Sequence, residues 1–267
     1  MGEANSVISL LQKMNNVKDL LKCKYVLDGL VSRASVEQHH NIKSKNIQDY
    51  VEYDAQFIST ASFNYETVAA EVESLELKCK SSPSTKWLTS TGLSYSWNSN
   101  NGNKTIKEPV DISDYRAIAS LMYDINKKYN TSFNSVLITQ YDNGNFYSPY
   151  HDDNEEELDS ESPMVVVSFG APRSVSFIHQ GRCDNSKPLL ELKPADGSVY
   201  IMKFGCQEVF FHSVKRDGRI KKKRFSLSFR KILPKSLRPA PPVVLSPVKT
   251  LIDQFDNGCL PKPVVFL

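Results

Sequence analysis

Hydrophobic residues recur with a helical period in two parts of the chain. In residues 6–30, apolar side chains recur at three- and four-residue steps, as they would along one face of a helix. The same spacing follows Pro109, runs from Ile112 to Ile125 and ends at the basic, Asn-rich sequence "KKYN". We predict a helix in each segment.

Beyond the second helix, the pattern changes to a period of two or to short apolar runs. The runs are "SVLITQY", "MVVVSFG", "SVSFI", "GSVYIM", "EVFFHSV" and "RFSLSFR", with Gly, Pro, Asp and Asn between them. Several short strands with turns between them predict a β-sandwich or barrel. Residues 81–107, rich in Ser, Thr, Asn and Gly, predict loops and short strands around three aromatics. After Leu233, "LRPAPPVVLSPVK" predicts an extended arm.

Composition excludes several classes of protein. The chain has 267 residues with 40% hydrophobic and 24% charged side chains. No apolar run approaches the roughly 20 residues that cross a bilayer, and we expect neither a membrane span nor a secretory signal. The five cysteines are odd in number, scattered and never spaced C-x-x-C, which favours reduced thiols in a cytosolic protein. We expect a monomer. A net charge of +3 does not by itself indicate nucleic-acid binding.

The acidic stretch "YHDDNEEELDSE" surrounds His151. Solvated acidic runs are common on protein surfaces, and that reading stays open. In an extended segment, however, His151 and Asp153 point to one side, which makes a chelating pair. His212, in "EVFFHSV", could complete a 2-His-1-carboxylate triad with open positions on Fe(II). The alternative for His212 is a half-buried histidine on a strand.

The strand "RFSLSFR" has one apolar and one polar face. Alternation puts Arg224, Ser226, Ser228 and Arg230 on the polar face. Such charges usually face water. If the strand instead lines a barrel, its arginines need anions, and a dicarboxylate cosubstrate would supply them. A guanidinium can grip a carboxylate with two hydrogen bonds, which lysine cannot reproduce.

Taken in order, these motifs resemble the AlkB-like family of Fe(II)- and 2-oxoglutarate-dependent dioxygenases. The resemblance covers residues 133–230 and rests on "FNSVLITQY", "HDD", "SFGAPR", "GCQEVFFH" and "RFSLSFR", the last similar to the family's R-x-N-x-T-x-R strand. It implies an α+β, mainly β fold: a double-stranded β-helix (jelly roll) with supporting helices. We accordingly divide the chain into an N-terminal helical extension (1–80), the dioxygenase domain with its substrate lid (81–234) and a Pro-rich arm (235–267).

The resemblance also implies roles for individual residues. His151, Asp153 and His212 would hold iron. Arg224 and Arg230 would hold 2-oxoglutarate, with help from Tyr141. Thr139 stands where many relatives have an Asn that contacts the cosubstrate, and Ser226 and Ser228 replace the Asn and Thr of the arginine strand. All three keep small hydrogen-bonding side chains, so we expect cosubstrate binding to survive with altered affinity.

The implied activity is oxidative demethylation of N-alkylated bases in nucleic acid, with release of formaldehyde and succinate. A flipped or single-stranded base would be held by stacking. Tyr95 resembles the family's lid tyrosine, with Trp87 and Trp97 as further candidates, although these aromatics could instead cap the core. Glu155 resembles an acid that contacts the base edge. The acids after it, Glu156, Glu157, Asp159 and Glu161, are interpreted as a solvated loop.

The basic run "KRDGRIKKKR" lies between two predicted site residues. Asp217-Gly218 is a turn signal, so we predict a hairpin that tracks phosphates with Lys221, Lys222 and Lys223. A solvated surface is the alternative. The chain resembles AlkB domains encoded by plant RNA viruses, which favours RNA over DNA.

Three other functions stay open. One is a protein side-chain hydroxylase of the same fold, and another is a catalytically inactive RNA-binding module. The third is a zinc hydrolase, which would leave the arginines without a role.

Overall fold

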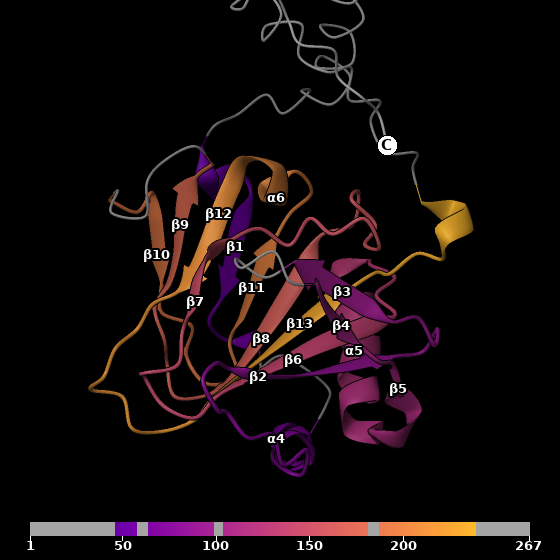
Figure 1. Cartoon of the computed structure of the whole chain (residues 1–267), viewed down its shortest axis with the longest axis horizontal. Coiled ribbons are helices and arrows are strands. Elements are labelled where there is room, and N and C mark those ends of the chain that lie inside the picture. The colour runs from indigo at the N-terminus through magenta and orange to yellow at the C-terminus, as the bar shows by residue number, and fades with distance from the viewer. Residues whose placement is uncertain (1–45, 58–63, 99–103, 181–186, 239–267) are drawn as a thin grey trace, which may run out of the picture. The chain divides into compact units, whose positions relative to one another are not determined.

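A computed structural model describes residues 46–57, 64–98, 104–180 and 187–238, which fall in one compact unit, Ser44–Pro239. The larger sheet has the order β1-β11-β8-β13-β6-β2-β5 and the smaller β10-β9-β12-β7, while β3 and β4 pair separately (Figure 1). The larger sheet comprises β1 (Val51–Asp54), β2 (Ser84–Thr89), β5 (Val110–Asp111), β6 (Ser135–Tyr141), β8 (Met164–Gly170), β11 (Val199–Met202) and β13 (Arg224–Arg230). The smaller comprises β7 (Ser148–His151), β9 (Val175–His179), β10 (Leu190–Leu192) and β12 (Phe210–Val214), and the pair comprises β3 (Tyr95–Asn98) and β4 (Lys104–Lys107).

Helices supplement the sheets. They are α4 (Tyr65–Glu73), α5 (Arg116–Tyr129) and α6 (Cys206–Val209), with 3₁₀ turns η1 (Ile47–Asp49), η2 (Ile112–Asp114) and η3 (Lys235–Leu237). Side chains of the two sheets meet between them, as where the rings of Phe177 on β9 and Tyr200 on β11 lie edge to face. This arrangement confirms the predicted mainly β, jelly-roll fold with supporting helices.

The main core lies between the larger sheet and helices α4 and α5. Strand β13 pairs antiparallel with both β6 and β8, so it is central in the sheet. Its apolar residues Phe225, Leu227 and Phe229 all belong to this core. Ser226, Ser228 and Arg230 alternate with them and line a cavity on the opposite face. The two-faced strand predicted from "RFSLSFR" is therefore confirmed.

Helix α5 confirms most of the second predicted helix. Ile118, Leu121 and Ile125 are fully buried, and burial of each such side chain contributes about 1.5–3 kcal/mol. The structure departs from the prediction at the start, because η2 forms a separate 3₁₀ turn. Tyr115, between the two, has φ −120° and ψ 77°, which interrupts the helical backbone.

The described residues before position 80, 46–57 and 64–79, are part of the same compact unit. Strand β1 pairs with β11 in the larger sheet, and Phe57, Val68 and Val72 are buried in the main core. The boundary predicted at residue 80 therefore falls inside the unit. The helix predicted at residues 6–30 and nearly all of the Pro-rich arm lie outside the described residues.

Two further predictions concern the described ranges. None of the helices there has the length and apolarity needed to cross a membrane. Cys79 and Cys206 are free thiols, and the other three cysteines lie outside these ranges.

Candidate metal and cosubstrate site

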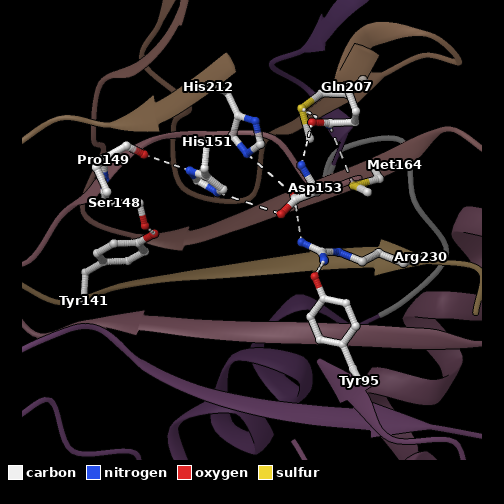
Figure 2. A network of polar contacts seen from close by, with 11 residues as sticks. Tyr95, Tyr141, Ser148, Pro149, His151, Asp153, Met164, Gln207, His212 and Arg230 are labelled. Carbon is white, nitrogen blue, oxygen red and sulfur yellow. Dashed lines mark hydrogen bonds and ion pairs between the residues drawn. The ribbon is translucent and has the colours of Figure 1, made fainter. Parts of the chain in front are cut away.

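Two strands of the smaller sheet bring the predicted metal ligands together. His151 on β7 is directly opposite His212 on β12, and their ring centroids are 4.3 Å apart. Asp153 lies two residues beyond His151. Its Oδ1 is 3.8 Å from His151 Nε2, and its Oδ2 is 3.6 Å from His212 Nε2 (Figure 2). One ligand atom from each residue lies within 4.8 Å of the others, so the three could hold one metal ion.

Hydrogen bonds fix the orientation of this group. His151 Nδ1 lies 2.8 Å from the carbonyl oxygen of Pro149. A carbonyl only accepts, so Nδ1 donates this hydrogen bond, and Nε2 is the ring nitrogen that faces Asp153. The main-chain N–H of Asp153 donates to Gln207 Oε1 over 3.0 Å. Both bonds hold the H-x-D segment at the end of β7.

The electrostatics of the site favour the protonation states that bind a metal. Burial opposes ionisation of Asp153, but Arg230, His212 and His151 outweigh it and lower its pKa to about 2. Burial, assisted by His151, lowers the pKa of His212 to about 3. At neutral pH the site thus presents a carboxylate and a neutral His212 imidazole, as metal ligation requires.

Arg224 offers unused donors in the interior. Its side chain is fully buried, and Nη2 donates to Ser168 Oγ over 3.0 Å. Its Nε and Nη1 have no hydrogen-bond partner. Gly170 is opposite Arg224 in the sheet, and at φ +82° a Cβ there would lie 2.6 Å from the carbonyl oxygen of Lys223, so glycine allows the backbone entering β13 to lie this close. A buried guanidinium with unpaired N–H groups is costly unless an anion satisfies it, which fits a carboxylate ligand.

The other residues predicted for the cosubstrate lie near this arginine. Tyr141 is opposite Arg224 in the register of β6 and β13, and its ring centroid is 5.5 Å from the guanidinium carbon. Thr139 is likewise opposite Ser226, and both line the cavity. Tyr141 also exchanges a hydrogen bond of 3.0 Å with Ser148. The structure therefore places Arg224, Tyr141, Thr139 and Ser226 close together, on the paired strands β6 and β13.

Arg230 has different contacts. Its Nη2 donates to Asp153 Oδ2 over 2.8 Å, and its Nη1 donates to the hydroxyl of Tyr95. Tyr95 is itself buried and stacks on Trp87, with ring centroids 4.7 Å apart. Arg230 is thus held by the metal-site carboxylate and Tyr95, and of its three nitrogens only Nε lacks a hydrogen-bond partner.

The cavity beside the metal site has a volume of about 1210 Å³. This exceeds the usual range of about 300–1000 Å³ for small-molecule sites. Trp97 and Glu155 line it, as predicted. Trp87 does not: it is buried, and its indole N–H donates to the Leu93 carbonyl over 2.9 Å. Trp87 therefore belongs to the core, which was the alternative reading.

Glu155 and Glu157 are more enclosed than a solvated loop would be. Burial, then the Asp153 carboxylate, raises the pKa of Glu155 to about 7. Glu157 is buried and accepts a hydrogen bond of 2.5 Å from Ser96 on β3. The assignment of Glu157 to the solvated surface was wrong, because its carboxylate joins the acidic segment to the β3–β4 pair. Glu156 and Glu161 are exposed.

The basic run is not a hairpin. It connects β12 of the smaller sheet to β13 of the larger one, and backbone bonds tie Asp217 and Ile220 to Gly144. Although the Asp217-Gly218 turn forms, none of Lys221, Lys222 and Lys223 lines the cavity. The lysines that do are ones the sequence reading missed: Lys78, Lys80, Lys104 and Lys107. They form two pairs that lie far apart along the chain, without a motif to mark them.

Comparisons with known proteins agree with this geometry. A model of the 2OG-Fe(II) oxygenase superfamily matches residues 39–230. The DNA oxidative demethylase ALKBH2 of Bos taurus is 35% identical over 111 residues, which are 40% of each chain. That of Mus musculus is 36% identical over 107 residues, 39% of this chain and 45% of its own.

A more distant relative is the replicase protein 1a of grapevine leafroll-associated virus 3, 29% identical over 115 residues, which are 43% of this chain and 5% of the replicase. The solved structure of OsALKBH1 is 15% identical with a TM-score of 0.44, over 68% of this chain and 96% of that one. The chain thus matches less than half of the length of these curated relatives. Since the family model spans most of the sequence, the chain belongs to the 2OG-Fe(II) oxygenase superfamily.

Proposed function

We propose that this oxygenase demethylates N-methylated bases in nucleic acid, and RNA in preference to DNA. The superfamily uses Fe(II) and 2-oxoglutarate. His151, Asp153 and His212 would hold the iron, since they offer two imidazoles and a carboxylate within ligand distance of one another. Bound there with 2-oxoglutarate and O₂, iron supplies the oxidising power that hydroxylates the N-methyl carbon, while the cosubstrate becomes succinate and CO₂. The hydroxylated methyl group then leaves as formaldehyde.

Arg224 would hold the distal carboxylate of 2-oxoglutarate. Its Nε and Nη1 are buried without partners, so Arg224 still has N–H groups to donate to a carboxylate. Tyr141, Thr139 and Ser226 would contact the same ligand from the neighbouring strand positions. Arg230 would keep Asp153 ionised and in place, because it donates to that carboxylate.

The large cavity supports a nucleic-acid substrate. Trp97 lines it and is partly exposed, so its ring could stack on an unpaired base. Glu155, whose Oε2 is buried without a partner, could bond the base edge. Similarity to enzymes named DNA oxidative demethylase supports demethylation as the reaction. Similarity to a viral replicase protein supports RNA as the substrate.

The observation that carries the proposal is the joint placement of a His-Asp-His cluster, a buried arginine with unpaired donors and a stacking-competent cavity. Iron-loaded protein should release succinate and formaldehyde in equal amounts from methylated oligonucleotides. Unmethylated oligonucleotides of the same sequence are the control. Equal succinate release with and without the methyl group, and no formaldehyde, would contradict the proposal and favour a protein substrate.

A further inference from the structure

Four lysines gather at the cavity from separate parts of the fold. Lys78 and Lys80 lie between α4 and β2, and Lys104 and Lys107 are the two ends of β4. Within the described ranges, none of the four forms an ion pair with a carboxylate. We call these four residues the lysine rim. Acidic residues 152, 153 and 155–157 line the same cavity, but none of them pairs with these lysines, whose ammonium groups are therefore open to an anionic ligand.

The basic loop that the sequence favoured is already neutralised in part. Lys215 pairs with Glu191 at 2.6 Å, Arg219 with Asp217 at 2.8 Å, and Lys223 with Glu73 at 3.3 Å. These pairs lie away from the cavity. The unpaired positive charge of the described fold is therefore better placed for a ligand at the lysine rim than in residues 215–223.

Hydrogen bonds of Cys79 hold the backbone at Lys78 and Lys80. Cys79 lies between Lys78 and Lys80, and it contacts strand β6 and its end: Sγ donates to the carbonyl of Gln140 over 3.1 Å, and its N–H donates to Asp142 over 3.3 Å. With Cys79 turned inward, both neighbouring lysines are exposed. On the β3–β4 pair, Lys107 Nζ lies 5.9 Å from the ring centroid of Trp97. Positive charge thus flanks the proposed stacking residue.

We propose that the lysine rim binds the phosphodiester backbone of a single-stranded polynucleotide whose methylated base stacks on Trp97. This inference rests on the proposed function and specifies how its substrate is held. Alternation of cationic groups with an aromatic ring is the arrangement that binds single strands without regard to sequence. The lysines would supply affinity and salt dependence, while the base contacts supply selectivity.

The test compares two variants that each lose three positive charges in the full chain: K78Q/K80Q/K104Q in the lysine rim and K221Q/K222Q/K223Q in the basic loop. Binding of a methylated single-stranded oligonucleotide is measured over a range of salt concentrations. Each lost phosphate contact on a single strand lowers the slope of log K against log salt by about 0.7, so the rim variant should lose about 2. The loop variant should keep the wild-type slope.

Equal slopes in the two variants would overturn the inference. Demethylation by the wild-type protein is followed separately, so that the two failures can be told apart. If wild-type protein demethylates the strand but the rim variant keeps its slope, the rim assignment is wrong and the function stands. If binding by the rim variant loses salt dependence but the wild-type protein does not demethylate the strand, the lysine rim is a binding surface and the proposed function is wrong.

A second inference comes from the segment that carries Asp153. Gln207 on α6 accepts the Asp153 N–H at Oε1, while its Nε2 lies 3.2 Å from Met202 Sδ (Figure 2). Gln180 Nε2 donates both to the Gln207 carbonyl, over 2.8 Å, and to Asp152 Oδ2, over 3.0 Å. Both residues after His151 are thereby attached to the same short helix. We infer that Gln207 is a positioning residue for the Asp153 ligand.

This role predicts an effect on metal affinity in the absence of turnover. Loss of an outer contact to a metal ligand commonly costs about 10–100-fold in affinity. Q207M keeps the length of the side chain but removes the acceptor, and should weaken Mn²⁺ binding by that factor, measured by electron paramagnetic resonance of the unbound ion. Q207E keeps an oxygen acceptor and should restore binding. Wild-type affinity in folded Q207M, or equal losses in both variants, would overturn the inference.

Discussion

The guanidinium of Arg230 donates a hydrogen bond of 2.8 Å to the carboxylate of Asp153, and both side chains are buried. Arg224, six residues earlier on the same strand, has two donors without a partner. The two arginines of β13 thus have different environments. This difference separates their expected roles, one at the metal ligand and the other at the cosubstrate.

Substitution of the two arginines should therefore affect different ligands. We expect Arg224→Lys to raise the KM for 2-oxoglutarate sharply with little change in Mn²⁺ affinity, because one ammonium cannot replace a planar fork. Arg230→Lys should instead weaken metal binding. Cosubstrate titrations and Mn²⁺ binding on both variants check this. An unchanged requirement of Arg224→Lys for 2-oxoglutarate would show that the buried donors do not hold it.

The three metal ligands should differ in their effect on stability. His151→Ala, His212→Ala and Asp153→Ala are all expected to abolish demethylation. Asp153→Ala should also destabilise the protein by about 3–5 kcal/mol, because it leaves the buried Arg230 without its carboxylate. Denaturant unfolding of the three metal-free variants measures this. Retained turnover in any variant would remove that residue from the ligand set.

The two aromatic residues of β3 should also act differently. Trp97 is partly exposed to the cavity, so Trp97→Ala should weaken binding of a methylated oligonucleotide by about 1–3 kcal/mol. Tyr95 is buried against Trp87 and bonds Arg230, so Tyr95→Phe should leave oligonucleotide binding nearly unchanged. Fluorescence anisotropy on both variants provides the comparison. Equal affinity of Trp97→Ala and wild type would argue against stacking.

Glu155 should make the metal-free protein less stable as the pH rises. Its folded-state pKa of about 7 lies above its ordinary value of 4.5, so the folded protein retains a proton that the unfolded chain releases. The contribution of this proton to the free energy of unfolding is fully present below pH 4.5 and is lost as the pH rises through about 7. Glu155→Gln should therefore gain stability relative to wild type between pH 5 and pH 8 in urea unfolding. A difference between the two proteins that does not change with pH would contradict this.

Local patterns predicted the site better than they predicted its surroundings. Alternation in "RFSLSFR" and the two-residue spacing of His151 and Asp153 follow from strand geometry, and the structure has both. The position of His212 opposite His151 depends on sheet pairing, which required the family resemblance to foresee.

The parts that the sequence did not predict depend on contacts between distant segments. Strand β1 has only four residues, and only one of them is buried. Its sequence therefore has no alternating hydrophobic pattern from which the pairing with β11 could be predicted. Lys78 and Lys104 meet at the cavity only because β2 and the β3–β4 pair lie beside it. Conversely, the basic residues 215–223 are close in sequence and drew attention, although the loop that carries them is bonded to Gly144 instead.

The most direct test is mass spectrometry of matched RNA and DNA oligonucleotides, each carrying one N-methyl base, after incubation with iron-loaded protein and 2-oxoglutarate. Asp153→Asn serves as the control that keeps the shape of the ligand but removes its charge. The account predicts that the wild-type protein lowers the mass of the methylated strand by one CH₂ unit, faster for RNA than for DNA, and that Asp153→Asn does not. Unchanged mass on every strand, with succinate formed equally in the absence of oligonucleotide, would contradict it.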